Sequence, residues 1–328
     1  MTLNRRDALG LVVLAATPAM ARPALGDTIP IAPSDPLEIL HLWPGGAPGG
    51  EHVRVTPRVV ERSTDPAFHD RFAQFTTGPI LTVLRPPRPN GASLLLIPGG
   101  GYKWAVVDKE GLDCARVFAQ AGVTCFVLRY RLPGDGWAAG PDAPLQDAQR
   151  ALRLVRSQAA AHGLDPARIA VLGASAGGHL AGMLTARADA AYAAVDDADA
   201  VSHRPDLTIL LYPVATMTDP HVHAGSRLEL LGTTPTPEGI EHYSLERMDW
   251  TGRPPTFLLH AMDDEAVPVE NSLQLLTTLR AAGVPCEVHL FQEGGHGFGI
   301  RLIAGKPAAV WPQLALAWAA RHGWITQT

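Results

Sequence analysis

A single serine lies at the centre of a short run of small residues, Gly173-Ala174-Ser175-Ala176-Gly177. An apolar run, 168–172, precedes it, and an alanine-rich stretch, 178–188, follows it. This order predicts a strand, a sharp turn and a helix, with the serine hydroxyl exposed at the turn. Small neighbours leave room for strained backbone, and a helix start behind the serine favours developing negative charge. The pattern therefore indicates Ser175 as a nucleophile for acyl transfer.

A base must activate this hydroxyl, because a serine at its ordinary pKa is a weak nucleophile. In a strand–turn–helix arrangement of this kind, an acid and then a histidine follow the serine along the chain. His296 lies in Gly294-Gly295-His296-Gly297-Phe298, directly after an expected strand at 286–291. The glycines on both sides let this loop bend the imidazole toward Ser175. We therefore predict His296 as the base, with a purely structural histidine as the alternative.

The acid is expected in Ala261-Met262-Asp263-Asp264-Glu265, after an apolar strand at 256–261. Three adjacent carboxylates mean that composition alone does not choose among them. Asp264 is favoured, partly on the resemblance described below, and lies three residues before Val267. Asp263 is second, with a solvated or turn-capping role as its alternative. The acid would hold the imidazole tautomer and stabilise the imidazolium.

Backbone donors for the transition-state charge are expected at Pro98-Gly99-Gly100-Gly101-Tyr102, after a short strand at 93–97. A glycine-rich loop in this position typically forms an oxyanion hole, usually with histidine where Pro98 stands here. We assign the hole to the N–H groups of Gly100, Gly101 and Ala176. Loss of one such donor typically raises the barrier by about 2.7–4 kcal/mol. A plain glycine turn is the alternative.

The elements that must position these residues alternate between strands and helices. Expected strands lie at 93–97, 123–130, 168–172, 206–212, 256–261 and 286–291, and expected helices at 110–121, 144–162, 178–188, 269–282 and 308–321. This alternation predicts an α/β fold, a mostly parallel sheet with helices on both faces. Segments 53–60 and 80–84 are expected to form an antiparallel edge, and 22–50 to be irregular. Residues 219–249 read as a small helical cap over the carboxyl ends of the strands.

The first residues indicate export. Arg5-Arg6 precede an apolar run at 8–16, and Ala19-Met20-Ala21 offers a cleavage site. Residues 1–21 therefore read as a signal peptide, which resembles the twin-arginine type, with an ordinary Sec signal as the alternative. A periplasmic or secreted protein is expected, with residues 22–328 forming one domain.

Composition excludes several classes of protein. The net charge of −5 comes without a dense Lys/Arg stripe, so nucleic acid is not an expected partner. No apolar run reaches the roughly 20 residues of a membrane span. The three cysteines, Cys114, Cys125 and Cys286, do not make a disulfide framework, although one pair could bridge. His221 and His223 lack an acidic or cysteine partner, so they read as cap surface, and no metal or cofactor is expected. Nothing in the sequence indicates an oligomeric state.

Seven short motifs occur in one order along residues 40–300. They are Pro98-Gly99-Gly100-Gly101-Tyr102, Glu110-Gly111, Tyr130-Arg131-Leu132-Pro133, Asp147 with Arg150-Ala151, Gly173-Ala174-Ser175-Ala176-Gly177-Gly178-His179-Leu180, Asp264 with Val267-Pro268, and Gly294-Gly295-His296-Gly297-Phe298. Together they resemble the α/β-hydrolase esterases related to hormone-sensitive lipase and bacterial feruloyl esterases. Within these esterases, the motifs resemble most the exported carbohydrate esterases that are described as acetylxylan esterases or xylanase-associated hydrolases. Trp43-Pro44-Gly45-Gly46-Ala47-Pro48 is also similar to that group.

The resemblance implies an esterase without metal or organic cofactor. Ser175 would attack an ester, His296 would shuttle the proton, and acetyl or similar small acyl groups would leave carbohydrate, such as a plant cell-wall polysaccharide or its oligomers. Tyr102, Lys103 and Trp104 follow the oxyanion loop and are expected to rim the pocket, with ordinary packing as the alternative for these residues and for Trp137. Three other functions remain open: a carboxylesterase for aryl or alkyl esters, feruloyl esters included, a serine peptidase, and a non-catalytic sugar-binding relative. Peptidases of the prolyl oligopeptidase type usually carry a propeller, for which the segment before Pro98 is expected to be too short.

Overall fold

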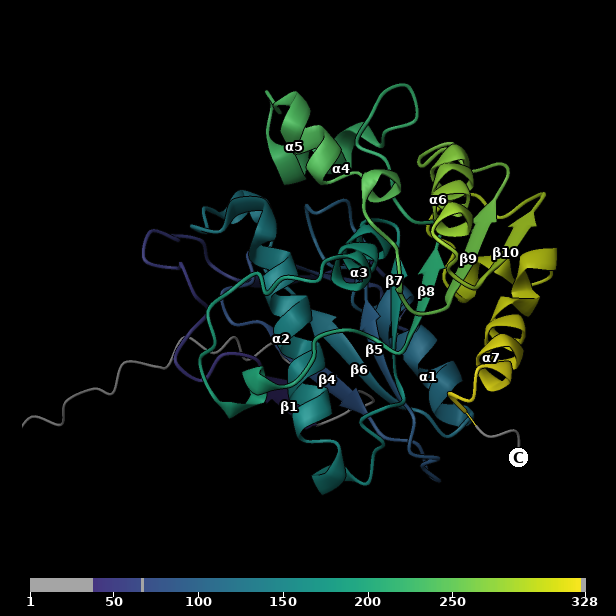
Figure 1. Cartoon of the computed structure of the whole chain (residues 1–328), viewed down its shortest axis with the longest axis horizontal. Coiled ribbons are helices and arrows are strands. Elements are labelled where there is room, and N and C mark those ends of the chain that lie inside the picture. Colours follow the sequence, from purple (N-terminus) through teal and green to yellow (C-terminus); the bar gives the residue numbers. More distant parts are fainter. Residues whose placement is uncertain (1–37, 66–67, 326–328) are drawn as a thin grey trace, which may run out of the picture.

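The computed structural model describes residues 38–65 and 68–325. In these residues, the main sheet has eight strands in the order β1-β4-β6-β5-β7-β8-β9-β10 (Figure 1). Their bounds are β1 Glu38–His41, β4 Ile80–Leu84, β6 Thr124–Arg129, β5 Ser93–Ile97, β7 Ile169–Ala174, β8 Leu207–Leu211, β9 Thr256–Ala261 and β10 Cys286–Phe291. The helices are α1 Asp113–Gln120, α2 Ala143–Ser157, α3 Ala176–Ala186, α4 Ala224–Leu231, α5 Pro237–His242, α6 Glu270–Ala281 and α7 Trp311–Arg321. The alternation of strands and helices predicted from the sequence is confirmed.

The sheet is parallel from β6 to β10, and β1 and β4 add an antiparallel edge. Every residue of β5 to β9 is buried, as expected for a parallel sheet that is covered on both faces. Side chains alternate between two cores: Leu95 and Val171 pack in one core with α2, α3 and α6, and Leu94 and Leu172 in the other with α1 and α7. The carboxyl ends of the parallel strands therefore meet at one edge, where loops carry the site.

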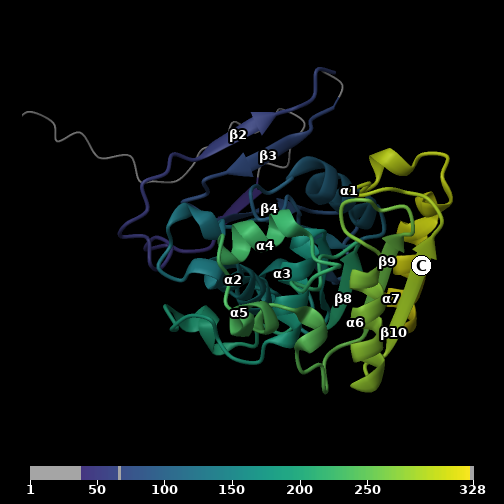
Figure 2. The same cartoon turned by 90° about the horizontal axis from the view of Figure 1, so that it is seen from above.

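Two expectations near the amino end are wrong. Segment 53–60 is not part of the main sheet, because only β2 (Arg58–Glu61) is extended there and it pairs with β3 (Arg71–Gln74) in a separate two-stranded sheet. Figure 2 shows this small sheet away from β9 and β10. The stretch expected to be irregular contains β1, which pairs with β4. These strands have four residues each and are partly exposed, so no alternating apolar pattern marks them.

The segment 219–249 carries α4 and α5, which stand beyond the carboxyl ends of the strands (Figure 1). Each helix begins at a side-chain cap: His223 accepts from the Ser226 N–H, and Thr236 accepts from the Gly239 N–H. Such caps satisfy amides that have no partner inside the helix. Both helices are therefore specified locally, although they are short, and we call 219–249 the cap segment.

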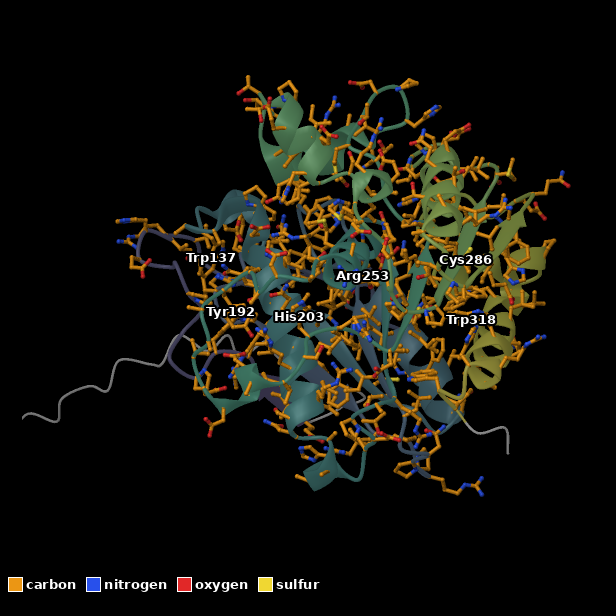
Figure 3. All side chains as sticks on the ribbon, in the orientation of Figure 1. Trp137, Tyr192, His203, Arg253, Cys286 and Trp318 are labelled. Carbon is orange, nitrogen blue, oxygen red and sulfur yellow. The ribbon has the colours of Figure 1, made fainter. Side chains whose placement is uncertain are left out.

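The three cysteines are free. Cys114 and Cys125 are buried in the core around α1, and Cys286 is half-buried at the start of β10 (Figure 3). Among the described helices, none is long and apolar enough to cross a membrane. The expected signal peptide, residues 1–21, lies outside the described residues.

A buried ion pair joins the irregular segment directly after β6 to α2. Arg131 and Asp147 are both fully buried, and the Arg131 Nε–H donates to Asp147 Oδ1 at 2.9 Å. The same oxygen accepts from Trp43 Nε1–H at 2.7 Å, and Arg131 also donates to the Pro48 carbonyl. Removing one member of a buried pair leaves the other charge without compensation. This pair therefore holds the segment around Trp43 and Pro48 against the body of the fold.

We expect Asp147→Asn to destabilise the protein by about 3–5 kcal/mol, because Arg131 would keep its charge in a dry environment. Urea unfolding followed by circular dichroism measures this loss. The matched control is Glu38→Gln, which breaks the exposed pair with Arg85 and should cost less than about 1 kcal/mol. Equal losses in the two variants would contradict the assignment.

A second carboxylate faces the cap. Burial, together with the negative charge of Glu229 on α4, raises the pKa of Asp135 to about 7. Asp135 Oδ2 is buried and finds no hydrogen-bond partner among the described residues. The folded state thus binds this proton more tightly than the unfolded chain, whose aspartates titrate near 3.8. The stability that this proton contributes is complete below pH 3.8 and is lost as the pH rises toward 7.

At pH values above 7, Asp135→Asn should therefore raise the urea midpoint of unfolding. Near pH 4, it should change that midpoint little. Glu229→Gln should give a smaller gain of the same sign, since burial is the larger cause of the shift. Unfolding curves at the two pH values test this prediction. A gain that is the same at both values would rule out the titration of Asp135 as its source.

Candidate active site

The turn between β7 and α3 places Ser175 in a backbone conformation that side chains rarely adopt. Its φ is +54° and its ψ is −122°, and α3 starts at the next residue. Glycine is required on both sides of the turn: a Cβ at Gly173 would collide with the Gly177 carbonyl, and one at Gly177 with the Ile97 and Pro98 carbonyls. The small residues of the motif are therefore explained by close backbone approach. The predicted strand, turn and helix are present, and the serine stands at the apex.

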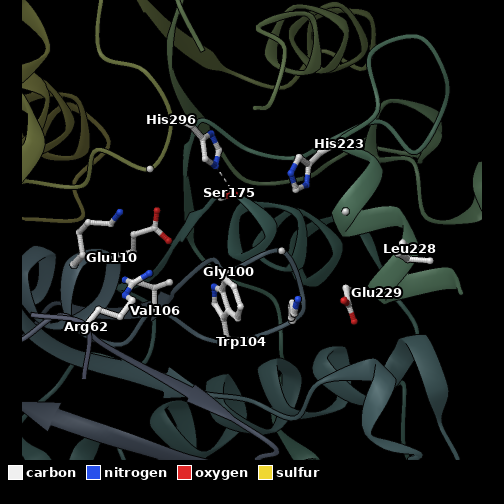
Figure 4. Close-up of a pocket in the computed structure, with 15 residues that line it drawn as sticks. Arg62, Gly100, Trp104, Val106, Glu110, Ser175, His223, Leu228, Glu229 and His296 are labelled. Atoms are coloured by element: carbon white, nitrogen blue, oxygen red, sulfur yellow. Dashed lines mark hydrogen bonds between the residues drawn. The ribbon is translucent and has the colours of Figure 1, made fainter. Parts of the chain in front are cut away.

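The loop after β10 brings His296 to this serine. Ser175 Oγ–H donates to His296 Nε2 at 2.8 Å (Figure 4). Asp264 Oδ2, in the loop after β9, accepts from His296 Nδ1–H at 2.7 Å. The Gly294 and Gly295 amides donate to Asp263 Oδ1, both at 2.8 Å, which holds the histidine loop in its turn. The structure thus brings Ser175, His296 and Asp264 together, and gives Asp263 the turn-capping position.

Asp264 is held ionised by its neighbours. Its Oδ1 accepts from the Val267 N–H at 2.8 Å, and its Oδ2 lies 3.2 Å from His260 Nε2. Burial alone would raise the pKa of Asp264, but hydrogen bonds from two histidines and a backbone amide outweigh it and hold the pKa well below its usual range. Sequence reasoning missed His260. The signal that could have indicated it is a histidine inside the buried strand β9.

The loop 98–102 has the shape of an oxyanion hole. Gly100 and Gly101 have φ values of +130° and +65°, and the Gly100 carbonyl accepts from the Lys103 and Trp104 amides in a tight turn. A Cβ at Gly100 would collide with Trp104. Within the described part of the chain, the N–H groups of Gly100, Gly101 and Ala176 donate to no protein acceptor. These amides, beside Ser175, are free to receive a substrate oxygen.

This loop is braced without the histidine that usually precedes such glycines. Tyr130 OH donates to the Pro98 carbonyl at 2.8 Å, and the Gly99 N–H donates to Glu110 Oε2 at 2.9 Å. Glu110 Oε1 also accepts from Tyr212 OH, which in turn accepts from the Gly299 N–H. Glu110 and Tyr212 thus connect the oxyanion loop to the histidine loop. Glu110 was among the motif residues, but its supporting role was not predicted, and Tyr212 was missed, because both depend on contacts between distant segments.

Tyr102 is not on the rim of the pocket. Its side chain is 1% exposed, and its OH donates to His179 Nδ1 at 2.7 Å. His179 Nε2–H donates to the Tyr243 carbonyl in the cap, and burial lowers the pKa of His179 to about 4, so the ring stays neutral. The positive φ of Tyr102, +62°, turns the side chain inward. The expectation for Tyr102 is therefore corrected: it connects the oxyanion loop, α3 and the cap.

Ser175 and His296 open onto a pocket of about 460 Å³ between the oxyanion loop and α4 (Figure 4). The residues that line it are Arg62, Gly100, Gly101, Lys103, Trp104, Val106, Lys109, Glu110, Ser175, His223, Gly225, Leu228, Glu229, His296 and Gly297. Lys103 and Trp104 lie on its wall, as expected for rim residues. Trp137 takes the packing alternative, because it is buried beneath Arg131 near α2 (Figure 3).

His223 was expected on the cap surface, and the structure places it on the side that faces the pocket. His223 lines the pocket, across from His296 (Figure 4). It lies between β8 and α4, as the residue that caps the start of α4. His221, two residues earlier, lines a different cavity. Within residues 38–65 and 68–325, no cluster of three His, Cys, Asp or Glu side chains is arranged to hold a metal ion.

This geometry supports acyl transfer. A hydroxyl contacts a histidine, the histidine contacts an ionised carboxylate, and free amides face the space beside the hydroxyl. Such a set supplies a nucleophile, a base and charge stabilisation, which are the three requirements of nucleophilic attack on a carbonyl.

Comparisons with known proteins agree with this chemistry. The chain is 32% identical over 221 residues to an acetylxylan esterase from Xylanibacter ruminicola, covering 65% of this chain and 42% of that protein. It is 35% identical over 207 residues to endo-1,4-beta-xylanase B from Butyrivibrio fibrisolvens, covering 63% of this chain and 32% of that protein. The chain thus spans less than half the length of these two curated relatives.

A solved structure is similar over almost its whole length. It is the acetyl ester-xyloside bifunctional hydrolase from Caldicellulosiruptor lactoaceticus, with 33% identity, a TM-score of 0.70, and coverage of 88% of this chain and 97% of that one. A family model described as alpha/beta hydrolase fold matches residues 94–300, which carry loop 98–102, the turn at Ser175 and the loop of His296. The chain belongs to this family of α/β hydrolases.

Proposed function

We propose that the protein is a serine carboxylic ester hydrolase that removes acetyl or similar small acyl groups from carbohydrate. The observation that carries the proposal is the chain of hydrogen bonds from Ser175 through His296 to Asp264, which opens onto a pocket beside free amides. Similarity to an acetylxylan esterase and to an acetyl ester-xyloside hydrolase supports the substrate class. Plant cell-wall polysaccharide, or its oligomers, is the proposed source of the ester.

The reaction begins when Ser175 Oγ attacks the ester carbonyl while His296 Nε2 takes its proton. Asp264 stabilises the imidazolium that forms, because it stays ionised against His296. The oxyanion accepts from the amides of Gly100, Gly101 and Ala176. His296 then protonates the departing sugar oxygen, which leaves an acyl group on the serine. Water, deprotonated by the same histidine, releases the acid and restores Ser175.

The pocket also has apolar walls. Trp104 and Leu228 line it together with the polar groups, which favours a second candidate substrate, an aryl or alkyl ester such as a feruloyl ester.

A cell-wall substrate would also suit the export that residues 1–21 suggest. We extend the proposal accordingly: residues 22–328 act as one exported domain, with 219–249 as its cap.

Substitution of the nucleophile gives a direct test. Ser175→Ala should lower p-nitrophenyl acetate hydrolysis by at least about 10⁴-fold, because no other hydroxyl contacts His296 Nε2 in the described part of the site. Initial rates and an unchanged circular dichroism spectrum provide the measurement. Substantial activity in the folded variant would remove Ser175 from the mechanism.

The two adjacent aspartates make a matched pair. Asp264→Asn should lower kcat by roughly 10⁴-fold, because the amide favours the wrong imidazole tautomer. Asp263→Asn keeps an oxygen that accepts from Gly294 and Gly295, so its loss should stay below about tenfold. Steady-state kinetics decide between them. The reverse order would exchange the roles of the two residues.

The substrate class is tested by acetate release from acetylated xylan, acetylated pectin and acetylated monosaccharides, run beside methyl ferulate. We expect the highest kcat/KM on acetylated xylan or its oligomers. Preference for methyl ferulate would instead support the aryl esterase. The Ser175→Ala protein serves as the blank for spontaneous hydrolysis.

A further inference from the structure

His223 has no part in the steps above, although it lines the same pocket as Ser175 and His296. It belongs to the short loop before α4, and its ring lies across the pocket from the His296 ring (Figure 4). A Cβ built on Gly101 would lie 3.9 Å from His223 Cε1, so the ring stands next to the oxyanion loop. A polar ring in this position needs a partner when substrate displaces water from the pocket.

The capping bond determines which nitrogen carries the proton. The Ser226 N–H donates to His223 Nδ1 at 3.1 Å, and Ser226 Oγ lies 2.8 Å from the same nitrogen. A backbone amide is always a donor, so Nδ1 must act as the acceptor. The neutral ring therefore carries its proton on Nε2. In the described residues, Nε2 has no protein partner, so this donor is available to the pocket.

The ring is also kept neutral. Burial lowers the pKa of His223, and the nearby His296 lowers it further, while Asp264 acts in the opposite sense. When His296 takes the serine proton, its charge disfavours a second proton on His223. The ring therefore offers one fixed N–H throughout the reaction, unlike His296, which must gain and lose a proton.

The chemistry of an acetyl ester tells which side of the substrate can use this donor. The acetyl methyl has no hydrogen-bond acceptor, and its carbonyl oxygen is already served by three amides. A donor that faced the methyl would lose its water and gain nothing in return. A sugar offers hydroxyl and ether oxygens next to the esterified position. Glu229, on α4, adds a hydrogen-bond acceptor to this wall of the pocket.

We propose that His223 is a specificity residue, whose Nε2–H donates a hydrogen bond to a hydroxyl or ether oxygen on the alcohol side of a carbohydrate ester. The inference rests on the proposed function and extends it to the binding of the sugar. It also assigns a role to the loop before α4. This loop presents the Nε2–H donor, which the capping hydrogen bond from Ser226 fixes, to the leaving group. The donor lies opposite His296, the base that protonates the leaving group.

Two substitutions separate the Nε2–H donor of His223 from its hydrogen bond that caps α4. In His223→Asn, the amide oxygen replaces Nδ1 as the acceptor that caps α4, but no side-chain atom reaches the position of Nε2. In His223→Gln, the longer side chain places an amide N–H near the position of Nε2 and no longer accepts the hydrogen bond that caps α4. We expect His223→Asn to lower kcat/KM for acetylated xylo-oligosaccharides by roughly three- to tenfold, mainly through KM. The change for p-nitrophenyl acetate should stay below about twofold, since its alcohol offers no sugar oxygen.

His223→Gln should recover most of the activity on the oligosaccharide and have a lower Tm than His223→Asn. A merely structural histidine would give the opposite ranking, because the variant that lacks the cap would then be the less active one. His221→Asn, two residues away on the other side of the loop, is the control and should leave both substrates unaffected.

Three results would overturn the inference: equal losses on both substrates in His223→Asn, no loss on either, or failure of His223→Gln to recover activity. The wild-type protein tests the proposed function separately. If it hydrolyses p-nitrophenyl acetate but releases no acetate from any acetylated carbohydrate, the proposed substrate class fails and the inference fails with it. If it releases acetate and His223→Asn matches it, only the inference fails.

Discussion

The close approach of α3 to the end of β5 is the constraint on which the site depends. A side chain at Gly177 would collide with the Ile97 and Pro98 carbonyls, and one at Gly173 would collide with the first turn of α3. The glycines let the helix start directly behind Ser175 and against the loop that follows β5. Two of the proposed oxyanion donors, Gly100 and Gly101, therefore come from a segment about 75 residues before Ser175, and backbone contact sets their distance. The strained φ of Ser175 is maintained by this packing.

Three carboxylates hold the loops around that contact. Glu110 binds the Gly99 amide, Asp263 binds two amides of the histidine loop, and Asp264 orients His296. Each carboxylate accepts from backbone N–H groups that would otherwise lack partners in a sharp turn. The loops at 98–102 and 294–298 are rich in glycine. Ionic hydrogen bonds from neighbouring segments therefore give them the rigidity that a preorganised site needs.

The cap is connected to the same machinery. His179, in the first turns of α3, joins Tyr102 of the oxyanion loop to the Tyr243 carbonyl in the cap. His223, at the other end of the cap segment, faces the pocket. Both rings are neutral because burial lowers their pKa values, and in both a single hydrogen-bond pattern determines the tautomer. The segment that lines one wall of the pocket is thus connected through His179 to the loop that we propose as the oxyanion hole.

The amino-acid sequence predicted nucleophilic chemistry at Ser175, with His296 as the base and glycine amides as donors, and it predicted the order of the strands and helices between them, which the fold confirms. It could do so because each signal is local: a sharp turn requires glycine, and buried strands and amphipathic helices have their own periods. It narrowed the acid to three neighbours, with Asp264 favoured partly by resemblance. Only the tertiary structure placed Asp264 against His296, turned Tyr102 inward, brought His223 into the pocket and paired β1 with β4. These outcomes depend on contacts between distant segments, and no local pattern encodes the direction in which a loop side chain points.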